Sequence, residues 1–202
     1  DNQYGSGEVF VYASDVVSRL STETSFLITI LPVNGAPVVD AIADQVIDED
    51  GSLTLTLSAS DVDGDVVTFS ASADNATASV DGSTLTVSPA ADFNGSLAVV
   101  VTANDGELEG VDGFTLTVNA VNDAPVLDAL VDATTSEDTA YSVNLSSSDV
   151  DGDDVSYSVS VSSGSAVVDD STLTVTPEAN YNGEAEVTVE VSDGEYTSAT
   201  TF

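Results

Sequence analysis

The sequence predicts an all-β chain built from β-sandwich modules that repeat in tandem. Three observations predict this: a pattern that recurs after 88 residues, short runs with an apolar residue at every second position, and Asp-Gly or Asn-Gly pairs between the runs. A long fixed period is the mark of tandem modules. The alternating runs are typical of strands that bury one face, and the glycine-containing pairs are typical of tight turns.

The repeat is clearest in an acidic motif. Asp61-Val62-Asp63-Gly64-Asp65 returns as Asp149-Val150-Asp151-Gly152-Asp153, at an offset of 88 residues. Three carboxylates at alternate positions make an oxygen-rich bend, which the glycine helps to turn inward, and hard cations such as calcium prefer oxygen ligands. A solvated acidic turn is the alternative, since Asp and Gly both favour turns. Repulsion of roughly 1–4 kcal/mol per pair of carboxylates favours a bound cation.

The first 32 residues match the end of a repeat. The run at 26–30 aligns with 114–118 at an offset of 88, whereas the run at 9–15 aligns with 99–105 at an offset of 90. The loop between the two runs therefore carries two extra residues, and it contains Arg19. We expect this segment to supply two late strands of a preceding module.

From residue 33 onward the repeat runs without a gap. We therefore expect the C-terminal part of one module at 1–32, a complete module at 33–120, and a second module at 121–202 that lacks most of its final strand. The sequence has neither an initiating Met nor a signal peptide, which is the pattern expected of an internal piece of a longer exported chain.

Apolar residues at every second position mark the strands within each module. Examples are Leu53, Leu55 and Leu57; Val67, Phe69 and Ala71; and Val187, Val189 and Val191. About seven such strands in fewer than ~100 residues predict an immunoglobulin-like sandwich.

The composition excludes several classes of function. The chain has 36 acidic residues, one basic residue and a formal charge of −35, so we expect neither a nucleic-acid partner nor an anionic membrane surface. Without cysteine it forms no disulfide and no thiolate metal site. Without His, Cys or Lys, its Ser and Thr hydroxyls lack an ordinary activating base, and we predict that it is not an enzyme.

These motifs resemble cadherin repeats, and more closely the bacterial cadherin-like tandem repeats of large secreted adhesins. The resemblance covers residues 33–202 and, more weakly, 1–32. The linker of the form Asp-x-Asn-Asp-Asn-x-Pro reads Asn119-Ala120-Val121-Asn122-Asp123-Ala124-Pro125 here. The early glutamate, the Asp-x-Asp pair and the late Asp before a glycine fall at Glu49 and Glu137, at Asp61/Asp63 and Asp149/Asp151, and at Asp105 and Asp193.

The acidic motifs and the resemblance together predict calcium as the cofactor, with more than one ion at the junction between the two modules. The candidate ligands are Glu49, Asp50, Asp61, Asp63, Asp65, Asp92, Asp105, Asn119, Asn122, Asp123, Asp149, Asp151, Asp153 and Asp193. The linker before the first complete module has Leu31 and Gly35 where the second has Asn119 and Asp123, which predicts weaker calcium binding at the first.

The function expected from the resemblance is a calcium-stiffened stalk segment of a bacterial adhesin, extracellular, at the cell surface or secreted. Two alternatives stay open: a subunit of a self-associating extracellular filament, and a spacer module of a secreted glycan-degrading enzyme. The expected partners are calcium ions and neighbouring repeats of the same chain. Like chains are a further expected partner, through an apolar face in the first segment made of Phe10, Tyr12, Leu27 and Leu31.

Overall fold

The computed structural model describes residues 4–202, and every regular element in that range is a β-strand. The all-β class and the sandwich modules predicted from the apolar alternation are therefore confirmed. No helix in this range is long and apolar enough to cross a membrane. The chain divides into a unit that ends at Ala120 and a second unit, Val121–Phe202.

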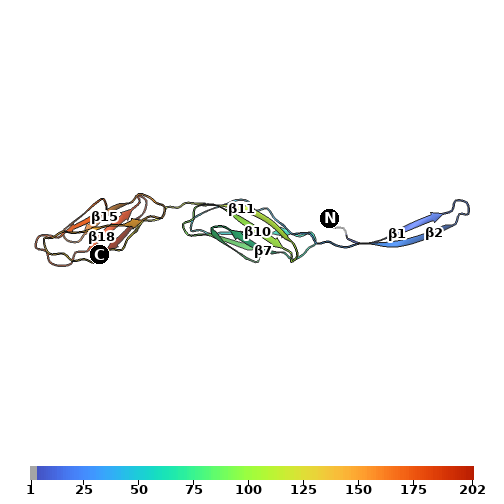
Figure 1. Ribbon diagram of the computed structural model, residues 1–202, viewed down its shortest axis with the longest axis horizontal. Coiled ribbons are helices and arrows are strands. Elements are labelled where there is room, and N and C mark those ends of the chain that lie inside the picture. The colour runs from blue at the N-terminus through green and yellow to red at the C-terminus, as the bar shows by residue number, and fades with distance from the viewer. Residues whose placement is uncertain (1–3) are drawn as a thin grey trace. The chain divides into compact units, whose positions relative to one another are not determined.

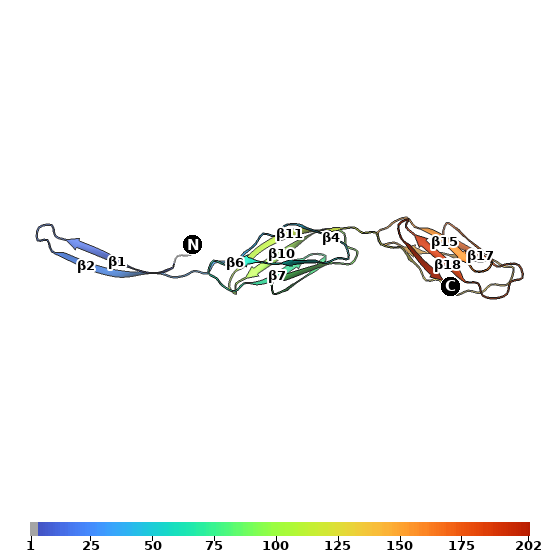
Figure 2. The ribbon, with the colours of Figure 1, turned by 180° about the vertical axis from the view of Figure 1, so that it is seen from behind.

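The first unit contains a sandwich of two facing sheets (Figure 1, Figure 2). The four-stranded sheet has the order β4 (Gln45–Asp48), β11 (Glu109–Asn119), β10 (Gly95–Asn104), β7 (Thr68–Ala73). The facing sheet has the order β5 (Leu53–Thr56), β9 (Thr84–Pro89), β8 (Ala76–Asp81). A short pair, β3 (Val38–Val39) with β6 (Ala59–Ser60), leads into the first acidic motif.

The second unit repeats this plan. One sheet has the order β15 (Ser156–Val161), β18 (Val187–Ser192), β19 (Thr197–Thr201), and the other has the order β13 (Tyr141–Asn144), β17 (Thr172–Thr176), β16 (Ser165–Asp169). The short pair is β12 (Val126–Leu127) with β14 (Ser147–Ser148), which leads into the second acidic motif.

Each sandwich is held by its own apolar core. Leu85 in the first unit and its repeat equivalent Leu173 in the second are both 0% exposed. Full burial of one such side chain stabilises a fold by about 1.5–3 kcal/mol. The inward residues of β10 and β18 are buried as well, while their alternate neighbours face outward, as the period of two predicts.

One strand pairing differs between the units. In the first, β4 pairs in parallel with Leu116–Asn119 at the end of β11. In the second, residues 133–136, which are equivalent to β4, form no strand. Phe202 aligns with Phe114 and is the last residue of the sequence, so this sequence holds no counterpart of the segment with which β4 pairs.

The N-terminal segment forms a hairpin of β1 (Gly5–Ser14) and β2 (Ser21–Ile30), paired antiparallel. Its loop, 15–20, is two residues longer than the equivalent loop 105–108, in agreement with the change of offset in the sequence. Every residue of both strands is exposed, so in residues 4–202 neither face of the hairpin is covered by a sheet. The four apolar residues expected to meet a like chain, Phe10, Tyr12, Leu27 and Leu31, are exposed, and that contact stays a prediction.

Candidate metal centre

Each acidic motif folds into a loop held by one aspartate. In the first unit, Oδ1 of Asp61 accepts hydrogen bonds from the backbone amides of Asp63, Gly64 and Asp65, at 2.8, 2.9 and 3.2 Å. Gly64 has a φ of +82°, a left-handed conformation that glycine adopts without a steric cost. The loop follows directly from β6, and its local hydrogen bonds fix the direction of the side chains that follow Asp61.

The second unit builds the same loop. Oδ1 of Asp149 accepts from the amides of Asp151, Gly152 and Asp153, at 3.0, 3.0 and 3.3 Å, and Gly152 has a φ of +81°. Carboxylate oxygens of Asp149, Asp151 and Asp153 lie within 4.8 Å of one another. Oxygens that share one calcium ion at about 2.3–2.6 Å can lie no more than about 5 Å apart, so this spacing fits a single ion.

The other oxygen of each anchoring aspartate is buried. Oδ2 of Asp61 and Oδ2 of Asp149 are shielded from solvent and have no hydrogen-bond partner within residues 4–202. A buried carboxylate oxygen without a donor is costly, and a metal ion is one of the few groups that offset this cost. Arg19 is the one basic residue of the chain, and it belongs to the exposed hairpin loop at 15–20, not to the acidic loops at 61–65 and 149–153.

The linker that enters each unit is tied to the loop by its backbone. The amide of Gly35 donates to Oδ2 of Asp63 at 2.8 Å. The amide of Asp123 donates to Oδ2 of Asp151, also at 2.8 Å. The linker and the acidic motif are therefore neighbours within each unit.

A second aspartate reaches the same linker. Nδ2 of Asn34 donates to Oδ2 of Asp105 at 3.0 Å, and Nδ2 of Asn122 donates to Oδ2 of Asp193 at 2.9 Å. Each of these asparagines donates its side-chain amide to the late aspartate of its own unit. The candidate ligands Asn122 and Asp193 thus meet in the second unit, and Asn34, which was not among the candidates, makes the same contact with Asp105 in the first.

The late aspartates are held as carboxylates. The pKa of Asp105 lies below its ordinary value, chiefly because the backbone amide of Leu108 donates to its Oδ1. The pKa of Asp193 is also lowered, with the hydrogen bond from the Asn122 side chain as the largest cause. Both groups are therefore charged at neutral pH and suited to bind a cation.

Other candidate ligands gather at the end of the first unit where β11 runs into the linker. Glu49 is 6% exposed, accepts a 3.5 Å hydrogen bond from Nδ2 of Asn94, and its backbone amide donates to the carbonyl oxygen of Asn119. The equivalent Glu137 in the second unit is exposed. A carboxylate buried at the edge of a sandwich is an unusual feature, because it must be paired or bound to a cation.

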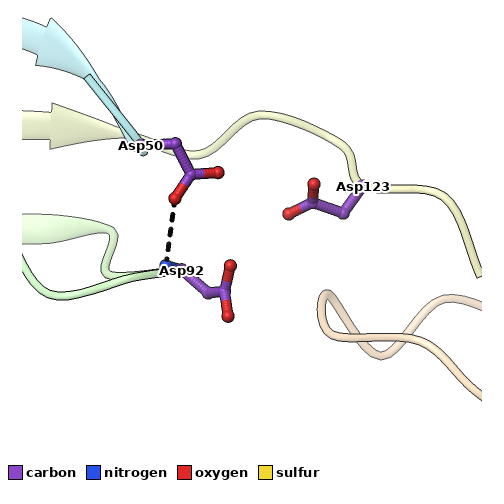
Figure 3. A group of neighbouring side chains, drawn as sticks. All are labelled: Asp50, Asp92 and Asp123. Atoms are coloured by element: carbon purple, nitrogen blue, oxygen red, sulfur yellow. Dashed lines mark hydrogen bonds between the residues drawn. The ribbon is translucent and has the colours of Figure 1, made fainter.

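Asp50 and Asp92 lie next to each other at this same end. Figure 3 shows the carboxylate of Asp50 directed at the backbone nitrogen of Asp92, and this long hydrogen bond measures 3.5 Å. Both residues have a positive φ, +60° and +55°. Asp138 and Asn180 repeat the contact in the second unit at 2.9 Å, with φ values of +61° and +59°.

Sequence reasoning missed one carboxylate at this end. Nδ2 of Asn119 donates to Oδ1 of Asp48 at 3.1 Å, so the two side chains are neighbours. Asp48 is the last residue of β4, and the parallel pairing with β11 places it directly beside Asn119. The repeat carries no signal for this residue, because its equivalent in the second unit is Ser136.

Two family models match the sequence. Residues 34–119 match a bacterial Ig domain and residues 121–202 match a cadherin-like domain. No curated protein matches the chain.

Several solved structures are similar to this chain. Human protocadherin-24 EC1-2 (form II) is 17% identical with a TM-score of 0.50, over 84% of this chain and 94% of that chain. Drosophila N-cadherin EC1-4 is 15% identical with a TM-score of 0.46, over 98% of this chain and 56% of that chain. An endo-fucoidan hydrolase, MfFcnA4, from glycoside hydrolase family 107 is 19% identical with a TM-score of 0.42, over 98% of this chain but only 33% of its own. This chain thus spans about a third of that protein.

Proposed function

We propose that this chain, which consists of bacterial immunoglobulin-like and cadherin-like repeats, is a calcium-stiffened segment of an extracellular adhesin stalk. Its task is mechanical: to hold a distal binding region away from the cell. The proposal includes no catalysis, because the 202 residues contain no His, Cys or Lys.

One observation carries the proposal. Oδ2 of Asp61 and Oδ2 of Asp149 are buried without a hydrogen-bond donor, and at Asp149 the carboxylate oxygens of Asp151 and Asp153 lie within 4.8 Å. A chain with a formal charge of −35 and one basic residue has almost no internal cation to offset this cost. A divalent cation from solvent supplies the missing charge, and the oxygen-only donor set favours calcium over softer metals.

The bound ion would act on the linker through the loop. Asp63 and Asp151 each hold a linker amide with one oxygen, so an ion that fixes these carboxylates also fixes the linker. When calcium is removed, the loop carboxylates repel one another and the hold on the linker weakens. Extracellular calcium modules have dissociation constants of about 10⁻⁴–10⁻³ M, so millimolar calcium keeps them loaded.

The proposal also keeps the ligands at the far end of the first unit. Glu49 is buried there, and Asp50, Asp92 and Asn119 lie beside it or in the adjoining loop. The burial of Glu49 supports a cation at this end, the resemblance places Asn119 in the linker motif, and Asp50 and Asp92 are further candidate ligands.

Isothermal calorimetry of the full chain with calcium chloride tests the proposal directly. We expect at least one ion per unit, with dissociation constants of about 10⁻⁴–10⁻³ M. The matched variant Asp61→Asn/Asp149→Asn should lose at least two ions. Small-angle scattering, first with calcium and then with excess chelator, should show a change from one narrow distribution of chain dimensions to a broad one. Absence of any calcium binding up to about 10 mM would overturn the proposal.

A self-associating extracellular filament is the second candidate, and the N-terminal hairpin favours it. Both faces of the hairpin carry exposed apolar side chains: Val9, Val11, Phe26, Ile28 and Ile30 on one, and Phe10, Tyr12 and Leu27 on the other. An exposed apolar patch of this kind is typical of a contact surface. Electron microscopy separates the two candidates, because a stalk gives isolated flexible particles and a filament gives regular ones.

A further inference from the structure

The second unit leaves unpaired a strand position that the first unit fills. In the first unit, residues 115–119 at the end of β11 run between residues 95–98 of β10, which are antiparallel to them, and β4, which is parallel. The segments of the second unit equivalent to these two neighbours are 183–186 and 133–136, and neither forms a strand. Among residues 4–202, no strand pairs with either segment.

The core beside this position contains a cavity. Three apolar residues of the second unit line a cavity of about 200 Å³ beside Phe202: Leu130, Tyr141 and Val143. Their equivalents in the first unit pack in one core cluster with the buried side chains of Leu116 and Val118: Ile42, Leu53 and Leu55. The cavity therefore suits two apolar side chains of an added strand, in the places of Leu116 and Val118.

The hairpin strand β2 carries the residues that this position requires. Residues 27–31 align with 115–119 at the offset of 88, so Ile28 and Ile30 correspond to the two buried side chains. In the hairpin these isoleucines are 47% and 56% exposed, so their burial elsewhere is favourable. Residues 27–31 carry no charge, and they can approach a second chain of formal charge −35 without adding repulsion between carboxylates.

The end of β1 must separate from β2 before this strand can be inserted elsewhere. Residues 28–30 of β2 pair with residues 5–7 of β1, two of which are glycine. Glycine has no side chain to pack, and every residue of the hairpin strands is exposed. The backbone hydrogen bonds lost to β1 are replaced by those to 183–186, so the exchange conserves main-chain pairing.

We propose that the second unit accepts residues 27–31 of a second copy of this chain as its last strand. The added strand runs antiparallel to 183–186 and parallel to 133–136, with Ile28 and Ile30 in the cavity, and main-chain hydrogen bonds on both sides hold it. The inserted strand and the position that receives it lie in different parts of the chain. Each copy therefore inserts into one neighbour and receives a strand from another, and such head-to-tail contacts continue into filaments or rings.

This inference rests on the second candidate function, the filament, and gives it a partner and a strand register. It does not depend on calcium, because none of the candidate calcium ligands belongs to the three segments that would pair: 27–31, 133–136 and 183–186.

The register can be tested with single cysteines, since the chain has none of its own. In the first unit Thr117 pairs with Val46, and the equivalent pair between two copies is Thr29 of one and Thr134 of the other. Adjacent strands lie about 4.7–4.9 Å apart, a Cα separation that a disulfide spans. Full chains with Thr29→Cys, mixed with full chains with Thr134→Cys under mild oxidation, should therefore form a mixed disulfide.

Ser136→Cys in place of Thr134→Cys is the matched control for the register. Ser136 lies two residues further along the same segment, which puts its Cα atom about 8 Å from that of Thr29, beyond the reach of a disulfide. We expect at least about tenfold less mixed disulfide with this control. Equal yields with the two variants would overturn the inference.

Two further variants test the cavity and the strand position. Ile28→Thr/Ile30→Thr in the Thr29→Cys chain keeps β-branched residues but removes apolar area, and should lower the yield at least about tenfold. Addition of Thr-Leu-Thr-Val-Asn, a copy of residues 115–119, after Phe202 in the Thr134→Cys chain fills the position from within and should abolish the mixed disulfide. An unchanged yield in either variant would overturn the inference.

The remaining outcomes separate this inference from the other proposals. A disulfide between two Thr29→Cys chains as the main product would show that hairpins meet each other, and would overturn strand insertion. Sedimentation velocity of the parent at high concentration should show species larger than a dimer, and association that stopped at a dimer would also overturn it. Absence of the mixed disulfide, both with calcium and with chelator, would overturn the inference and leave the calcium proposal standing.

Discussion

The backbone amide of Asp123 donates a 2.8 Å hydrogen bond to Oδ2 of Asp151, a carboxylate 28 residues further along the chain. This carboxylate holds the linker, and it also belongs to the group in which oxygens of Asp149, Asp151 and Asp153 lie within 4.8 Å of one another. Gly35 and Asp63 repeat this relationship in the first unit. Any change that neutralises the loop aspartates should alter both cation binding and the hold on the linker.

Asp149→Asn should change the stability of the second unit in opposite directions with and without calcium. In chelator we expect the variant to be at least as stable as the parent, because it removes a buried charge whose Oδ2 has no donor. In calcium it should be less stable, because an ion present at 100 times its dissociation constant contributes about 2.7 kcal/mol that the variant loses. Urea denaturation measures both values. Asp169→Asn, at the exposed end of β16, is the control and should respond to calcium as the parent does.

Asp193 should make the metal-free protein more sensitive to acid. Its pKa is lowered in the folded state, so its contribution to stability is complete above the unfolded value, near 3.8, and is lost as the pH falls through the lower folded value. In chelator, Asp193→Asn should therefore lose less stability than the parent between about pH 5 and pH 2. Denaturation at each pH measures this. Asp169→Asn removes the same charge without this hydrogen-bonded turn, and an acid response equal to that of Asp193→Asn would contradict the prediction.

Asp92 should tolerate asparagine but not alanine. Its φ of +55° is left-handed, a conformation that Asn adopts readily and that costs Ala roughly 1 kcal/mol. The second unit already has Asn180 at the equivalent position, with a φ of +59°. In chelator we expect Asp92→Asn to unfold at the same temperature as the parent and Asp92→Ala to unfold earlier. Both variants should show a smaller rise of the melting temperature with calcium, and a full rise in Asp92→Asn would remove Asp92 from the ligands.

The hairpin should promote association between like chains. Phe10 and Leu27 are 49% and 66% exposed and lie on the same face of neighbouring strands, where Phe10 pairs with Ser25 and Leu27 pairs with Glu8. Phe10→Ser/Leu27→Ser removes apolar area from that face, so self-association should weaken. Sedimentation velocity over a range of concentrations measures this. Val100→Ser/Thr115→Ser, at the equivalent positions in the first sandwich, is the control, and a strictly monomeric parent would contradict the prediction.

Much of the fold and of each loop could be predicted from the sequence because it depends on neighbouring residues. The period-two alternation of Val187, Val189 and Val191 specifies a strand with one buried face, and β18 buries all three. The hydrogen bonds that Asp61 accepts from the backbone amides of residues 63–65 span only two to four positions. The motif therefore contains all the residues that form its turn. Repetition of the motif at 149–153 reproduces the same loop, because local hydrogen bonds and the glycine conformation are set by the same five residues.

Only the tertiary structure decided which of the repeated residues differ in their surroundings. Glu49 is 6% exposed directly after β4, where β4 pairs in parallel with the end of β11. That same pairing brings Asp48 to Asn119, across 71 residues. The approach of Val62 to Gly35 likewise joins a linker to a loop 27 positions away. Contacts of this kind depend on how strands distant in the sequence pack together, and a local pattern of residue types does not encode that packing.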